Sequence, residues 1–132
     1  MPPSVALYYA IVKAINDLEF DTYSASQDIE KKALPICRVQ LLSSNSTGQF
    51  LNARQYEYSF QLDVVTDQGG LEQGLTIAYM IMRELRKVSV DGFLTQINGE
   101  PSLNSMVDSS TNRILNRQTI RVNYDIIEDT AF

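Results

Sequence analysis

The segment Thr66–Gly74, TDQGGLEQG, has the composition of a loop that could bind a phosphate group. Such a loop follows a strand, opens a helix and points converging backbone N–H groups at the anion. It also brings a lysine and a hydroxyl to the phosphate and its metal ion. Here the segment lacks a lysine, and Leu75 and Thr76 occupy the places of that Lys-Ser/Thr pair. The glycine spacing also departs from the dinucleotide motif G-x-G-x-x-G, and Asp67 and Glu72 would repel an anion. We therefore predict a strand-to-helix turn in which glycine supplies a positive φ angle.

The other residue types that do chemistry are few and scattered. The 132-residue chain has no histidine, which removes the commonest general base and a common zinc ligand. Cys37 is the single cysteine, and its apolar surroundings, PICRVQLL, predict a buried thiol and not a nucleophile. Carboxylates occur singly, and no D-x-D-x-D calcium loop is present. We therefore predict no catalytic residue, no metal site and no cofactor.

Composition predicts a single folded domain, residues 1–132, that does not bind nucleic acid through its phosphates. Hydrophobic residues make up 44% of the chain and charged residues 20%, as in ordinary globular proteins. The net charge of -5 opposes binding by neutralisation of phosphates, although it would let DNA slide past. No signal peptide is visible, and the apolar run at residues 75–82 is too short to span a bilayer. We expect synthesis in the cytosol and no membrane partner.

Alternating polarity predicts the main strands. The strongest alternation lies in RQYEYSFQLDVVTD, residues 54–67, and a second lies in TIRVNYDII near the C-terminus. PICRVQLL, GFLTQING and SLNSMVDSSTNR predict further strands. The residues predicted to face the core on the two main strands are Tyr56, Tyr58, Phe60, Leu62, Val64, Ile120, Val122, Tyr124 and Ile126.

Apolar residues at three- and four-residue steps predict two helices, at residues 4–17 and 71–88. The predicted core-facing stripes are Val5, Tyr8, Val12, Ile15 and Leu18 in the first helix, and Leu71, Leu75, Ala78, Met82 and Leu85 in the second. The second helix is apolar on more than one face. Two explanations stay open: its own sheet and the first helix cover all of these faces, or one face forms a subunit interface.

The polar segments between these elements predict connections. Residues 19–33 suggest a loop with one short turn, and residues 43–53 and 100–113 suggest exposed, mobile segments. The resulting element order is α-β-β-α-β-β, with room for one more final strand. This order predicts the α+β class, with two main helices packed on a mostly antiparallel sheet of about four to five strands.

The order and pattern of five segments resemble the tail-terminator, or tail-completion, proteins of long-tailed bacteriophages. The segments are LYYAIVKAI, PICRVQLL, YEYSFQLDVVTD, LEQGLTIAYMIMREL and QTIRVNYDI. Proteins of this family are small acidic domains that form a hexameric ring at the head-proximal end of the tail tube. The resemblance implies a non-enzymatic structural protein of the virion tail, made in the host cytoplasm.

The resemblance also implies the partners. These are further copies of the chain, the tail tube protein and a head-completion or neck protein, with DNA passing through the ring without specific binding. A ring that closes on the tube is compatible with a monomer in isolation. Two alternatives stay open: another phage neck or baseplate adaptor, and a small-ligand-binding or enzymatic α+β domain whose pocket the sequence does not reveal.

Interface candidates come from this chain itself, since ring contacts are poorly shared in the family. The candidates for subunit or tube contacts are Phe50, Leu51, Arg54, Tyr79, Met106, Val107, Arg113 and Arg117. Apolar side chains on polar loops would anchor the contact, and guanidinium groups would pair with carboxylates. Acidic side chains from the polar face of strand 54–67 or from adjoining loops are predicted to outnumber Lys and Arg on the inner wall.

Overall fold

The computed structural model describes residues 2–18, 21–24, 34–50, 53–109 and 114–129, without the side chains of residues 21–24, 49 and 50. Its elements are α1 (Pro3–Asn16), β1 (Asp21–Ser24), β2 (Ile36–Phe50), β3 (Ala53–Asp67), α2 (Leu71–Leu85), β4 (Leu94–Ile97), β5 (Ser102–Asp108) and β6 (Leu115–Asp129). Two helices pack on a sheet whose pairs are antiparallel apart from β1 with β2. The predicted α+β class is therefore confirmed.

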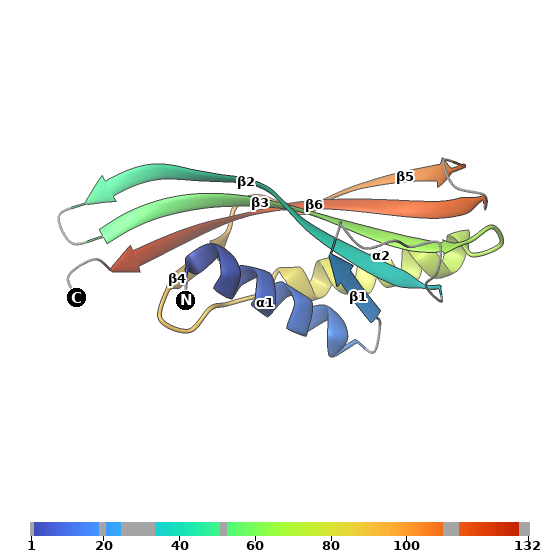
Figure 1. Cartoon of the computed structure of the whole chain (residues 1–132), viewed down its shortest axis with the longest axis horizontal. Helices are drawn as coiled ribbons and strands as arrows, with labels where there is room; N and C mark the ends of the chain where they lie inside the picture. The colour runs from blue at the N-terminus through green and yellow to red at the C-terminus, as the bar shows by residue number, and fades with distance from the viewer. Residues whose placement is uncertain (1, 19–20, 25–33, 51–52, 110–113, 130–132) are drawn as a thin grey trace.

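Three long strands form the body of the sheet, in the order β2-β3-β6. The short strand β1 pairs with the beginning of β2, at residues 36–39. The far edge of β6 is shared: β5 pairs with its first half and β4 with residues 124–127. Both helices lie on one face of the sheet, and the ends of β2, β3 and β6 extend past them at one end of the molecule (Figure 1).

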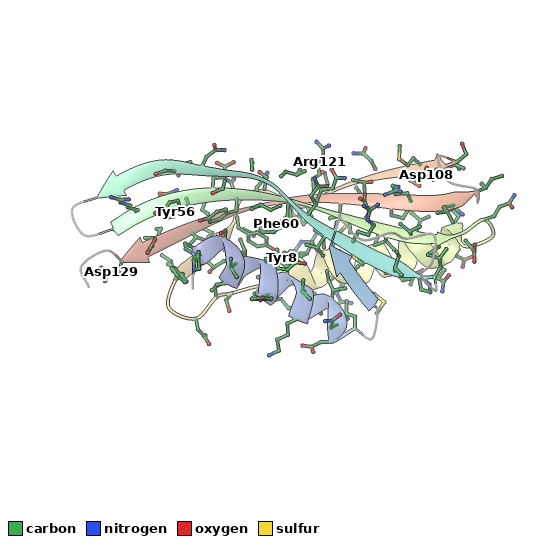
Figure 2. The ribbon with its side chains drawn as sticks, viewed as in Figure 1. Tyr8, Tyr56, Phe60, Asp108, Arg121 and Asp129 are labelled. Atoms are coloured by element: carbon green, nitrogen blue, oxygen red, sulfur yellow. The ribbon has the colours of Figure 1, made fainter. Side chains whose placement is uncertain are left out.

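The core lies between the helices and the inner face of the long strands. Phe60 is fully buried and points from β3 toward the helices, whereas Arg121 lies on the opposite face of the sheet (Figure 2). The buried hydroxyl of Tyr124 donates to the backbone oxygen of Leu85 at 2.6 Å, which ties the end of α2 to β6. The burial predicted for Tyr58, Phe60, Leu62, Val122 and Tyr124 is confirmed, Met82 is partly buried, and Leu75 is exposed.

The buried faces of both helices differ from the predicted stripes. The buried side chains of α1 are Leu7, Ile11 and Ile15, and those of α2 include Ile77, Ala78, Ile81 and Leu85. Leu71 and Leu75 were assigned to the core by spacing, but both are exposed. Gly74 explains the rotation of α2, because a Cβ there would lie 3.2 Å from the Thr66 hydroxyl oxygen. The close approach of helix and sheet at this glycine turns the leucine stripe outward.

Three segments predicted as connections contain strands, and β5 (Ser102–Asp108) lies in one of them, residues 100–113. The strand β2 continues to Phe50 through the segment predicted as an exposed connection, and it stays paired with β3 along its length. Register shifts between 41 and 43 and between 46 and 48 interrupt its alternation, which hides the strand from a period-two test. The four residues of β1 are too few to show a period, and their pairing with β2 defines the strand.

Candidate assembly surfaces

One side of α2 carries a row of exposed apolar side chains. Leu71, Leu75 and Tyr79 are all exposed, Tyr79 by 62%. Their four-residue steps place them along the same side of the helix. Arg86 lies near the same side of α2, and its Nη2 atom lies 2.9 Å from Oε2 of Glu100, in the β4–β5 connection. The row therefore faces the β5 side of the molecule and not α1.

The strand β5 adds two exposed apolar side chains to the same side. Leu103 lies opposite the core residue Ile120 in the β5–β6 register, so it belongs to the helix-bearing face of the sheet. Val107 is four residues further along the strand and shares that face, with 67% of its surface exposed. We call the set Leu71, Leu75, Tyr79, Leu103 and Val107 the β5 flank.

A second apolar surface lies at the opposite edge of the sheet. Val5 and Tyr9 of α1 are exposed, and Leu41 of β2, which lies beside them, is exposed too. With Ser4 and Tyr8 they line a shallow open groove of about 360 Å³. We call these five residues the β2 flank.

The strand edges beside the two flanks carry little charge. Among the described strands, β5 pairs with β6 alone, and β1 covers β2 no further than Val39. The open part of β2, residues 40–50, contains neither a charged residue nor a proline, and the sole charge of β5 is Asp108 at its end. Proteins usually protect open edges with such residues, because unpaired backbone groups are a template for pairing with another chain.

The sheet face away from the helices is largely polar, apart from a small buried apolar cluster of Ile36, Val65 and Leu115, and it carries an ion-pair cluster. Arg117 Nη1 lies 3.3 Å from Asp63 Oδ2, and Arg117 Nε donates to Asp108 Oδ2 at 2.9 Å. The Thr119 hydroxyl donates to Asp63 Oδ1 at 2.7 Å. The charged side chains are only 11–14% exposed. The Arg117 guanidinium is therefore engaged within the chain, and its predicted role in a subunit contact stays a prediction.

The other predicted interface residues are partly described. Tyr79 lies on the β5 flank, and Arg54 is exposed at the beginning of β3. Met106 and Val107 are exposed on opposite faces of β5, as neighbours in a strand must be. The side chain of Phe50 and all of Leu51 and Arg113 lie outside the described residues. Sequence reasoning missed the remaining flank residues, since spacing had placed Val5, Leu71 and Leu75 in the core.

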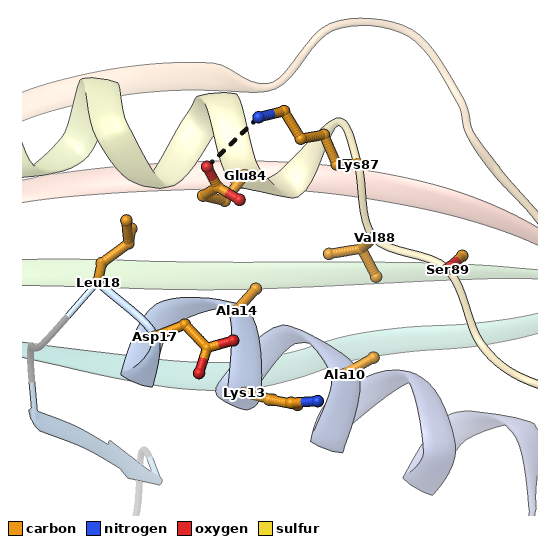
Figure 3. A pocket seen from close by; sticks show the side chains of 9 residues that line it. All are labelled: Ala10, Lys13, Ala14, Asp17, Leu18, Glu84, Lys87, Val88 and Ser89. Carbon is orange, nitrogen blue, oxygen red and sulfur yellow. Dashed lines mark ion pairs between the residues drawn. The ribbon is translucent and has the colours of Figure 1, made fainter.

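A pocket of about 400 Å³, lined by both charged and apolar side chains, lies between the C-terminal parts of the two helices (Figure 3). Lys13 and Asp17 line it from α1, and Glu84 and Lys87 from α2 and the residues after it. Lys87 Nζ lies 3.6 Å from Glu84 Oε1, so part of this charge is already paired. The mixture of both signs in an open pocket selects no class of ligand.

The described residues offer little for metal or nucleophilic chemistry. Within them, no cluster of three His, Cys, Asp or Glu side chains could hold a metal ion. Cys37 is fully buried, and burial, followed by the nearby negative charge of Asp63, raises the pKa of its thiol far above the ordinary value. A thiol held in this neutral form is a poor nucleophile. No helix in the described part of the chain is long and apolar enough to cross a membrane.

The glycine turn before α2 is held by the chain's own hydrogen bonds. The Asn116 amide donates to the backbone oxygens of Asp67 and Gln68, each at 2.9 Å, and the Thr66 hydroxyl donates to the Gly70 oxygen at 2.8 Å. The prediction of a positive φ is wrong for Gly70, whose φ is -103°. Instead, a Cβ on Gly70 would lie 2.9 Å from the Thr66 Cβ. Glycine is needed there for close approach.

Alanine at Gly70 should destabilise the protein by about 1–3 kcal/mol, because the added methyl group collides with Thr66 and with the backbone oxygen of Asp67. Gly69→Ala is the matched control, since a Cβ there meets nothing within 4 Å. Urea unfolding of both variants measures the difference. Equal stabilities would show that close packing does not explain the glycine at position 70.

Comparisons with known proteins bear on the fold. No protein-family model matches the sequence, and no curated protein matches it. Chains of solved structures do match, and one of them, a protein with no functional name, has a TM-score of 0.58 and 16% sequence identity over 96% of each chain. This likeness shows the fold alone. At such low identity it carries no information on activity or partners.

Proposed function

We propose that this protein is a structural phage assembly protein that caps the head-proximal end of the tail tube as a hexameric ring and joins it to the head or neck. The observation that best supports the proposal is the pair of apolar flanks at opposite edges of one sheet. An isolated copy exposes both flanks to water, whereas a ring would cover them in every copy. The element order shared with tail terminators is the second support.

The proposed partners are further copies of the chain, the tail tube protein and a head-completion or neck protein, in the virion. A neck or baseplate adaptor would use similar flanks and would differ in the structure that it binds. A ligand-binding or enzymatic domain would have to use the pocket between the helices. The flanks favour an assembly role over that last alternative, because they consist mainly of exposed apolar side chains, whereas charged side chains of both signs line the pocket.

Within the proposed ring, DNA passes without specific binding. On the polar sheet face Glu57 lies directly opposite Asp125 in the β3–β6 register, which places two carboxylates side by side. Arg121 is exposed on the same face, so its charge is mixed. The acidic excess of the whole chain opposes adhesion of phosphates. We expect no shift of duplex DNA in low-salt gels, and tight, salt-sensitive binding would contradict the proposal.

Co-sedimentation with cognate tail tubes tests the proposed function. Binding should saturate at one hexamer per tube, whatever the tube length, because each tube has a single head-proximal end. The matched measurement uses tubes sheared into shorter pieces, which creates new ends at a constant mass of tube protein. Binding in proportion to tube mass would indicate attachment along the tube wall, and no binding would exclude the tube as a partner.

A further inference from the structure

We propose that copies of this chain associate head to tail, with the β5 flank of one copy docked on the β2 flank of the next. The inference rests on the proposed ring and names the two surfaces that form it. The flanks lie at opposite edges of the sheet: α1 packs beside β1 and β2, whereas α2 packs over β3 and β6 (Figure 1). Two copies of the same orientation bring one flank of each type together when the second copy is shifted along the strands, because β5 lies level with residues 36–40 of β2 and Leu41 lies beyond them.

The shapes and chemistry of the two flanks suit each other. The β2 flank is a groove lined by Val5, Tyr8, Tyr9 and Leu41. The β5 flank presents exposed side chains along α2, with Tyr79 the most exposed of that row. Burial of apolar side chains against an apolar groove is the usual core of a stable protein interface. Aromatic residues such as the tyrosines on both flanks are enriched at such contacts.

The strand edges also fit this arrangement. The strand β5 is antiparallel to β6, which is antiparallel to β3, which is antiparallel to β2. In copies of the same orientation, β5 of one therefore runs antiparallel to β2 of the next, as the long strands do within the chain. The strand β5 lies level with residues 36–40 of β2, which β1 covers as far as Val39. The uncharged open part of β2, residues 40–50, therefore leaves its backbone groups available to β5 of a neighbour in the shifted arrangement.

A head-to-tail contact accounts for both flanks at once. A symmetric dimer through one flank would bury that flank on both copies and would leave the other flank exposed on both copies. A contact between unlike flanks leaves one free flank of each type at the two ends of any open chain of copies. Head-to-tail copies form a ring when the rotation between neighbours closes and an open filament when it does not; the proposed ring requires a rotation that closes.

Thiol cross-linking of two variants, each with one added cysteine, tests the contact. The first variant carries Leu75→Cys on the β5 flank and the second Tyr9→Cys on the β2 flank; both positions are exposed, so unchanged thermal melts are expected. The native Cys37 is fully buried and does not compete for the reagent. The two variants are treated with a short bis-maleimide, separately and as an equal mixture, at high protein concentration and both with and without cognate tail tubes. Gln73→Cys, exposed on another side of α2, replaces Leu75→Cys in the control mixture.

The expected result is a cross-linked dimer in the mixture of the two variants. No dimer is expected in either variant alone or in the control mixture. A variant with both cysteines should give a ladder of species that ends at the hexamer. Cross-linking of either variant with itself would indicate a symmetric contact and overturn the proposal, as would the absence of a dimer from the mixture. Co-sedimentation with tail tubes separates the two levels: tube binding without the mixed dimer refutes this contact alone, and a mixed dimer without tube binding refutes the proposed function alone.

Discussion

Replacement of Phe60 by alanine lowers the free energy of unfolding by about 3–5 kcal/mol. Phe60 is fully buried in the middle of β3 and lies opposite Val122 of β6 on the inner face of the sheet. Removal of its ring leaves a cavity between the sheet and the helices that the long paired strands cannot easily collapse. Urea unfolding of the purified variant gives the measurement.

Ser59→Ala is the matched control for this substitution. Ser59 is the preceding residue of β3 and lies on the polar face, where its hydroxyl donates to Asn123 Oδ1 at 2.5 Å. The loss of one exposed hydrogen bond should cost about 1 kcal/mol or less. A larger effect at Ser59 than at Phe60 would mean that the two faces of β3 are interchanged.

Replacement of Arg117 by methionine should cost about 3–5 kcal/mol, because Asp63 and Asp108 then lose the cation that they share in a poorly hydrated site. The control Asp108→Asn keeps the ion pair between Arg117 and Asp63, so it should cost less. Both are compared with the parent protein by urea unfolding at neutral pH.

The triple variant Arg117→Met, Asp63→Asn and Asp108→Asn separates the effect of the lost ion pairs from that of lost packing. It removes both carboxylates together with the cation, and it should recover most of the stability that Arg117→Met alone loses. A triple variant no more stable than the single one would show that the aliphatic part of the arginine, and not its charge, supports the sheet.

The sequence predicts the buried face of an element correctly where the spacing of apolar residues fits a single orientation of that element. In β3 and β6 the strict alternation around Phe60 and Tyr124 predicts which face is buried, because a strand has two faces and one of them is polar. In α2 several helical phases satisfy the apolar pattern. The contact of Gly74 with Thr66 selects among them, and that contact exists only once the helix is packed on the sheet.

Apart from Tyr79 and Val107, the flank residues could not be predicted for the same reason. Leu71 and Leu75 look like core residues until the helix phase is known, and Leu103 belongs to a flank because β5 lies at the edge of the sheet. The strand β5 lies at the edge because both β4 and β5 pair with β6, and no local sequence pattern predicts this pairing. The extension of β2 was hidden in the same way, because its partner strand β3, and not its own side chains, defines it.

Electron microscopy of cognate tail tubes mixed with the purified protein tests the central claim most directly, with averaging of images of the two tube ends. The account predicts a six-fold ring at one end of each tube, its retention with the control variant Gln73→Asp and its loss with Leu75→Asp, which places a charge on the β5 flank. Density at both ends, density along the tube wall, or bare tubes at saturating protein would contradict it.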